Sequence, residues 1–130
     1  MKKNVVKHIN HYYVGGCDNR RKNGRGKNGI SQQYYLSKRI AKIRETEKDF
    51  VVFGHMIVFD IDKSDIEALE ADVKSHLTKY DFLRHVQNDH FEMKLSPDRR
   101  EYVMFAGLSL LYAKQYCDMR GWEYEIDWPY

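Results

Sequence analysis

The chain has 130 residues and a mass of 15.6 kDa, which is the size of one domain and leaves no room for a second. Its apolar fraction of 42% argues against a disordered chain, and its longest apolar stretches, 50–59 and 104–113, are too short to cross a bilayer. The first residues lack a signal-peptide pattern, and two cysteines, Cys17 and Cys117, are too few for a disulfide framework. These features predict a single cytoplasmic domain over 1–130, with free thiols and no membrane contact.

The net charge of +3 hides an asymmetry along the chain. Residues 1–45 carry 12 basic and two acidic residues, a net charge of +10, whereas residues 46–130 carry 10 basic and 17 acidic residues, a net charge of −7. The densest cations alternate with Gly and Asn, which favour turns and expose backbone amides. They are Arg20, Arg21, Lys22, Arg25 and Lys27. This pattern predicts a basic loop that contacts nucleic acid, and a merely solvated loop is the alternative.

In chain order, the β-branched and aromatic residues of 5–15 predict a first strand, closed by glycines, that runs into the basic loop. A short second strand over 26–31 would return from that loop. Leu and Ile at i, i+4 and i+7 then predict a helix over 34–45. The strongly apolar segment 50–60 predicts a strand in the middle of the sheet.

Further along the chain, Ser64 and Glu67 have the spacing of a capping box, which predicts a second helix over 65–79. A Ser-Pro start and a Gly stop predict a long helix over 97–120. Aromatic and acidic residues alternate over 122–128, which is typical of a half-buried strand. The predicted fold is α/β, in the order β-β-α-β-α-α-β, with a mixed or antiparallel sheet of three or four strands packed by three helices.

Two charged residues lie at the border of predicted apolar helix faces. At 100° per residue, Glu70 lies about 55° from the centre of the apolar stripe of the second helix. Arg39 holds a similar position on the first helix. A carboxylate at the border of a core needs a cation or a metal as partner. A salt bridge between the two helices, or side chains that reach the surface, would satisfy both residues without any function.

Four short segments follow one another along the chain, and their order and spacing carry more information than any one of them alone. They are Lys27-Asn28-Gly29-Ile30-Ser31, Lys38-Arg39-Ile40, Ala68-Leu69-Glu70 and His90-Phe91-Glu92. Together with the predicted order of elements, they resemble the GIY-YIG nuclease superfamily, in particular its divergent branch in phages and mobile elements, whose second motif reads K-I-G-I-[ST]. The resemblance covers about 11–96 and leaves 97–130 as an extension made of a helix and an edge strand.

The resemblance implies a metal-dependent endonuclease that hydrolyses phosphodiester bonds in DNA. In that family a strand tyrosine assists the attacking water, which here would be Tyr12 or Tyr13. Arg39 would hold the scissile phosphate and Glu70 would ligate Mg²⁺ or Mn²⁺, while Lys27 stands where many relatives carry a second tyrosine. The cations expected to contact DNA are Arg20, Arg21, Lys22, Arg25, Lys27, Lys38 and Lys42.

Other functional classes remain open at this point. A nucleic-acid-binding or anti-defence protein would keep the basic surface without catalysis. A protein-binding module would use the acidic and aromatic strand over 122–130. The histidine spacings, such as His8 with His11, rarely place two imidazoles on one metal, so they predict no metal site.

Overall fold

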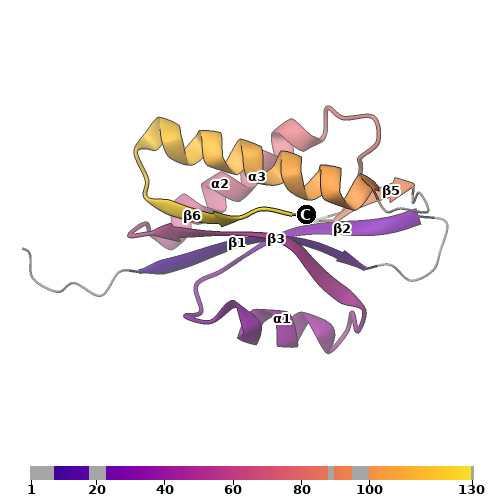
Figure 1. Cartoon of the computed structure of the whole chain (residues 1–130), viewed down its shortest axis with the longest axis horizontal. Coiled ribbons are helices and arrows are strands. Elements are labelled where there is room, and N and C mark those ends of the chain that lie inside the picture. The colour runs from indigo at the N-terminus through magenta and orange to yellow at the C-terminus, as the bar shows by residue number, and fades with distance from the viewer. Residues whose placement is uncertain (1–7, 18–22, 88–89, 95–99, 130) are drawn as a thin grey trace, which may run out of the picture.

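The computed structural model describes residues 8–17, 23–87, 90–94 and 100–129, and it consists of a six-stranded sheet with helices on both faces (Figure 1). The strands lie in the order β4-β5-β2-β1-β3-β6, and each neighbouring pair is antiparallel. The strands are β1 (Ile9–Cys17), β2 (Asn23–Ser31), β3 (Phe50–Phe59), β4 (Arg84–Gln87), β5 (His90–Lys94) and β6 (Tyr124–Asp127). The helices are α1 (Leu36–Arg44), α2 (Lys63–Leu77) and α3 (Arg100–Arg120).

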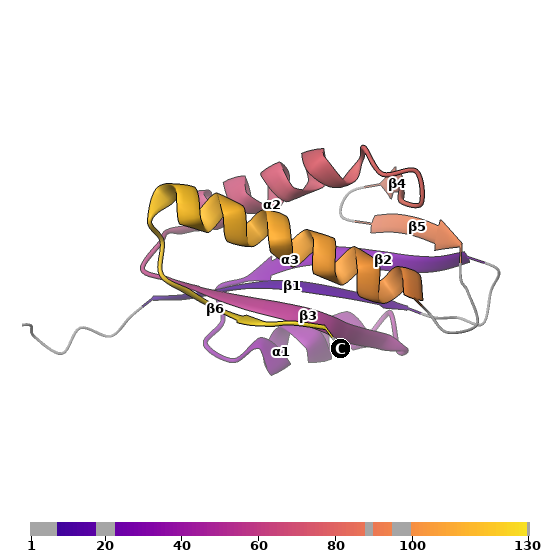
Figure 2. The same cartoon turned by 45° about the horizontal axis from the view of Figure 1, so that its top comes forward.

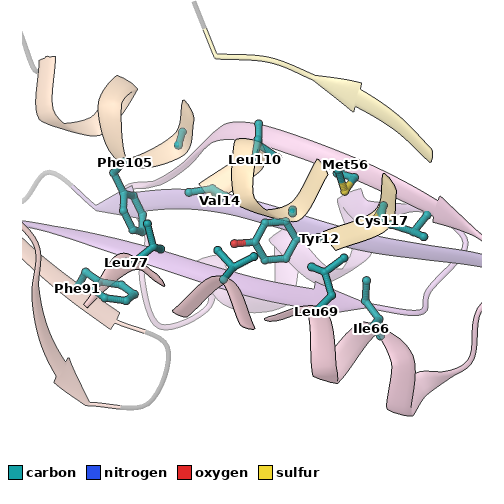
Figure 3. Packing of buried hydrophobic residues seen from close by; sticks show 14 of the residues in the cluster. Tyr12, Val14, Met56, Ile66, Leu69, Leu77, Phe91, Phe105, Leu110 and Cys117 are labelled. Atoms are coloured by element: carbon teal, nitrogen blue, oxygen red, sulfur yellow. The ribbon is translucent and has the colours of Figure 1, made fainter. Parts of the chain in front are cut away.

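The helices form two unequal layers. The short helix α1 covers one face of the sheet, while α2 and α3 lie side by side over the other (Figures 1 and 2). Because successive side chains of a strand point to opposite faces, Tyr12 and Tyr13 of β1 point into different layers. Tyr12 belongs to the large core beneath α2 and α3 (Figure 3), and Tyr13 packs with Ile40, Ile43 and Phe50 beneath α1.

The predicted fold class is confirmed in outline, since the chain is mixed α/β with three helices. The predicted sheet of three or four strands and the predicted element order are wrong. Between α2 and α3 the chain forms the strands β4 and β5, which extend the sheet beyond β2. These strands are short and carry several charged or imidazole side chains, and only the alternation of buried Phe91 and Met93 marks β5. The strand β3 lies inside the sheet, but one position from the edge formed by β6.

The capping box of α2 also differs from the predicted one. Asp62 is the N-cap residue, and its side chain accepts a hydrogen bond from the backbone N–H of Asp65, whose side chain accepts one from the N–H of Asp62. Ser64, predicted as the cap, instead donates its hydroxyl to Asp62 Oδ1 at 2.7 Å. An extended backbone at Asp62 makes this cap possible, and α2 therefore begins two residues earlier than predicted.

The ends of the chain fit the remaining sequence predictions. The strand β6 shows the predicted alternation of half-buried and exposed side chains, and it pairs with β3. The predicted helix over 97–120 is α3, although its first three predicted residues lie outside the described part of the chain, as do residues 5–7 of the first predicted strand. Within the described ranges, no helix combines the length and apolar content that a membrane span requires.

Candidate nucleic-acid interface

The face of the sheet beneath α1 brings together two of the residues singled out in the sequence. Arg39 of α1 donates a hydrogen bond from Nε to the hydroxyl oxygen of Tyr13 at 3.3 Å. Tyr13 is fully buried, and its ring covers Gly29, the residue paired with it on β2. A side chain at Gly29 would collide with the phenol, so the glycine of the Lys27–Ser31 motif positions the tyrosine.

A pocket of about 300 Å³ opens beside this pair. Its cationic lining comes from Lys27 of β2 and from Arg39 and Lys42 of α1. Glu45 and Glu47 also line it, so the formal charge of the lining is +1. Since Tyr13 occupies only Nε of the Arg39 guanidinium, which has five N–H donors, the other N–H groups can donate to a ligand in the pocket.

The carboxylates of the pocket have partners of their own. Glu47 Oε1 lies 3.4 Å from Nε2 of His90, which is paired with Lys27 across β2 and β5. Glu45 forms an ion pair of 3.1 Å with Lys42, in which both side chains are more than 60% exposed. An ion pair this exposed is weak, so a stronger anion can displace Glu45 from Lys42.

Two histidines lie on the same face as Tyr13. His11 Nδ1 is 2.8 Å from His55 Nε2, and His11 Nε2 is 3.2 Å from the carbonyl oxygen of Tyr34. A carbonyl can only accept, so His11 carries its proton on Nε2 and, when neutral, accepts from His55 Nε2–H. Burial lowers the pKa of His55 to about 4, with a further lowering by His11 that Asp127 opposes. His55 is therefore neutral at pH 7.

Tyr12 points away from this face into the core between the sheet and the helices α2 and α3 (Figure 3). Asn28 Nδ2 donates to the Tyr12 hydroxyl at 2.6 Å and to Ser109 Oγ at 3.1 Å. Tyr12 and Asn28 are fully buried. The predicted role of a tyrosine that assists an attacking water requires access to water, and in this structure neither Tyr12 nor Tyr13 is exposed.

Glu70 belongs to α2 and Arg39 to α1, and these two helices lie on opposite faces of the sheet (Figure 1). Oε1 of Glu70 is 3.8 Å from Nζ of Lys74, and both side chains are less than a quarter exposed, which confirms the predicted position at the border of the core. The expectation that Arg39, Glu70 and a strand tyrosine share one pocket is wrong. The hydrophobic pattern of each helix predicts which side of it faces the sheet, but both sheet faces are apolar and either could receive α2.

The position of Glu70 does not fit the predicted Mg²⁺ or Mn²⁺ site. An ammonium group already accompanies its carboxylate, and the sheet separates it from the phosphate that Arg39 would hold. Among the residues that the structure describes, no three His, Cys, Asp or Glu side chains are grouped so that they could hold a metal.

The other predicted DNA contacts lie on or near the α1 layer where they are described. Lys38 and Lys42 of α1 and Arg25 of β2 are exposed. Arg20, Arg21 and Lys22 lie outside the described residues.

The strand β6 forms one edge of the sheet, and its acidic side chains are exposed. Trp122 and Trp128, which flank this strand, pack partly against the core, and Tyr130 is not described. A protein partner for that strand stays a prediction.

Two features of this surface were missed in the sequence. Tyr34 and Tyr35 are 64% and 61% exposed at the start of α1, and a Tyr-Tyr pair directly before a basic helix was the available signal. The pairing of His11 with His55 had no signal, because the strands β1 and β3 bring together residues 44 positions apart. Comparison with protein-family models, curated proteins and solved structures finds no match to this chain.

Proposed function

We propose that the chain is a cytoplasmic nucleic-acid-binding domain that contacts the phosphate backbone with α1 and the adjoining end of β2. The observation that carries this proposal is the difference in charge between the helices α1 and α2, which lie on opposite faces of the sheet. The helix α1 has four basic and no acidic residues among nine, whereas α2 has four acidic and two basic residues among fifteen. A polyanion is therefore attracted to the α1 layer and repelled by α2.

The pocket beside α1 supports a specific phosphate contact within this surface. Lys27 offers a compact ammonium, and Arg39 offers a planar guanidinium whose orientation is fixed by Tyr13. A guanidinium held in this way loses little side-chain freedom when it donates to two phosphate oxygens. The nearby exposed Lys38 adds attraction without fixed geometry, as expected for backbone contacts that do not depend on sequence.

The test is a binding titration by fluorescence anisotropy with a labelled DNA oligonucleotide at low salt. We expect the wild-type chain to bind, and Arg39→Gln to bind about fivefold to 30-fold more weakly because it loses a charged contact of about 1–2 kcal/mol. Glu70→Gln is the matched control across the sheet, and its affinity should equal that of the wild type. Binding that is indifferent to Arg39→Gln but altered by Glu70→Gln would contradict the proposal.

Endonuclease activity is the second candidate, and the contact between Arg39 and Tyr13 is the observation that favours it. The GIY-YIG resemblance assigns this arginine to phosphate binding, and the buried Tyr13 holds its guanidinium in place instead of assisting a water. Since Glu70 does not fit the metal site of that resemblance, its carboxylate has no part in the candidate. Incubation of plasmid DNA with Mg²⁺ or Mn²⁺ tests it: cleavage should be lost in Arg39→Ala and kept in Glu70→Gln. An intact plasmid with the wild-type chain would leave binding alone as the function.

A further inference from the structure

The two exposed tyrosines before α1 stand next to the basic surface rather than apart from it. Tyr35 is the N-cap residue of α1, and Lys38 and Lys42 follow it at i+3 and i+7. Residues at these spacings lie on the same side of a helix, about 4.5 Å and 10.5 Å along the axis from Tyr35. An anionic chain that runs along the lysines therefore passes the aromatic rings.

The backbone of these tyrosines is fixed although their side chains are exposed. The carbonyl oxygen of Tyr34 accepts a hydrogen bond from His11 Nε2 at 3.2 Å, and that of Tyr35 accepts one from the N–H of Lys38 at 3.3 Å. The two rings contact each other edge to face, with centroids 4.8 Å apart and an interplanar angle of 82°. They thus present aromatic surface in a defined place, and each of the two residues is more than 60% exposed.

We propose that Tyr34 and Tyr35 form a stacking platform for unpaired bases, so that the α1 surface binds single-stranded nucleic acid in preference to duplex. This inference rests on the proposed function and adds its substrate class. Stacked bases of a duplex shield their faces from a protein ring, whereas a single strand can turn its bases onto the rings. The nearby Lys38 and Lys42 bind the phosphates, and the tyrosines make the affinity depend on whether the sugar carries a base.

The test compares three labelled ligands at low salt: a thymidine oligonucleotide, an oligonucleotide of the same length with abasic sites, and a duplex. The wild-type chain should bind the thymidine strand most tightly. Loss of one stacked base weakens binding between about fivefold and 150-fold, so Tyr35→Ala should lose affinity for the thymidine strand within this range. Its affinity for the abasic strand should not change, because the phosphates and lysines remain.

Two further variants separate stacking from other roles. Tyr35→Phe keeps the aromatic ring and should keep the affinity. Met119→Ala removes an 83% exposed apolar side chain from α3, on the other layer, and should bind all three ligands as the wild type does. Both tyrosines are exposed, so these variants should fold, which circular dichroism checks.

The outcomes distinguish the two proposals. The stacking platform would be overturned if Tyr34→Ala and Tyr35→Ala bound each of the three ligands with the same affinity as the wild-type chain. The proposal of a phosphate-binding surface would then remain intact. Self-association that depends on Tyr35, without any effect on oligonucleotide affinity, would also overturn it and indicate a second copy as the occupant. Absence of binding to all three ligands at low salt would refute the proposed function itself.

Discussion

Neutralising the two exposed lysines of α1 should reduce the salt dependence of nucleic-acid binding by a calculable amount. Each phosphate contact contributes about −0.9 to the slope of log affinity against log salt concentration on duplex DNA. Lys38→Gln combined with Lys42→Gln should therefore change the slope by about 1.8. Between about 50 and 200 mM salt, the wild-type chain should lose about 12-fold more affinity than the double variant.

The competing ion pair of Lys42 with Glu45 should not cancel this effect. Both side chains are more than 60% exposed, and the median worth of such a pair is about 0–1 kcal/mol. Anisotropy titrations of duplex DNA at several salt concentrations give the two slopes. The combination of Lys63→Gln and Lys79→Gln is the matched control, since it removes the same charge from two exposed lysines, the first residue of α2 and a residue just after its C-cap. Equal slopes for the wild type and the α1 variant, or a changed slope for the α2 control, would refute the reasoning.

Three other predictions concern the fold that supports this surface. Gly29→Ala should lower the free energy of unfolding by about 1–3 kcal/mol in urea titrations, because the new methyl group collides with the ring of Tyr13, and an unchanged midpoint would contradict that packing. The pKa of His55 is about 4 in the folded chain and 6.5 in the unfolded chain, so between these pH values the unfolded chain binds one more proton and stability falls as pH drops from 6.5 to 4. After allowance for solvent screening, the free energy of unfolding should fall by about 1–2 kcal/mol. The variant His55→Gln should lack this part of the pH dependence. Burial raises the pKa of the Cys117 thiol to about 12, so the native chain holds little of the reactive thiolate. In a Cys17→Ser background, Cys117 should therefore react with a disulfide reagent much faster in urea than in the native chain. Equal rates would contradict its burial.

The sequence was sufficient for the helix α1 and the strand β6. The apolar spacing i, i+4, i+7 predicted α1, where Ile40 and Ile43 are buried, and the period-two alternation predicted β6. The uneven charge along the chain also predicted a basic surface in its first third. These features depend on local periodicity and composition, which a single sequence contains.

The layers of the fold could not be predicted in the same way. The strand β1 is buried on both faces from Asn10 to Gly16, so its alternation does not indicate which helix covers which side. Arg39 and Glu70 were correctly predicted to lie at the borders of apolar helix faces, yet their helices pack on opposite sides of the sheet. The role of Asn28, which links two buried hydroxyl groups, also depends on contacts across the sheet.

Amide chemical-shift changes on adding an oligonucleotide to the ¹⁵N-labelled chain would map the nucleic-acid-binding surface residue by residue. We expect that at low salt the changes concentrate in α1, in Tyr34 and Tyr35, and around Lys27, and that they fade as salt is added. Changes concentrated in α2, with α1 unaffected, would contradict this expectation.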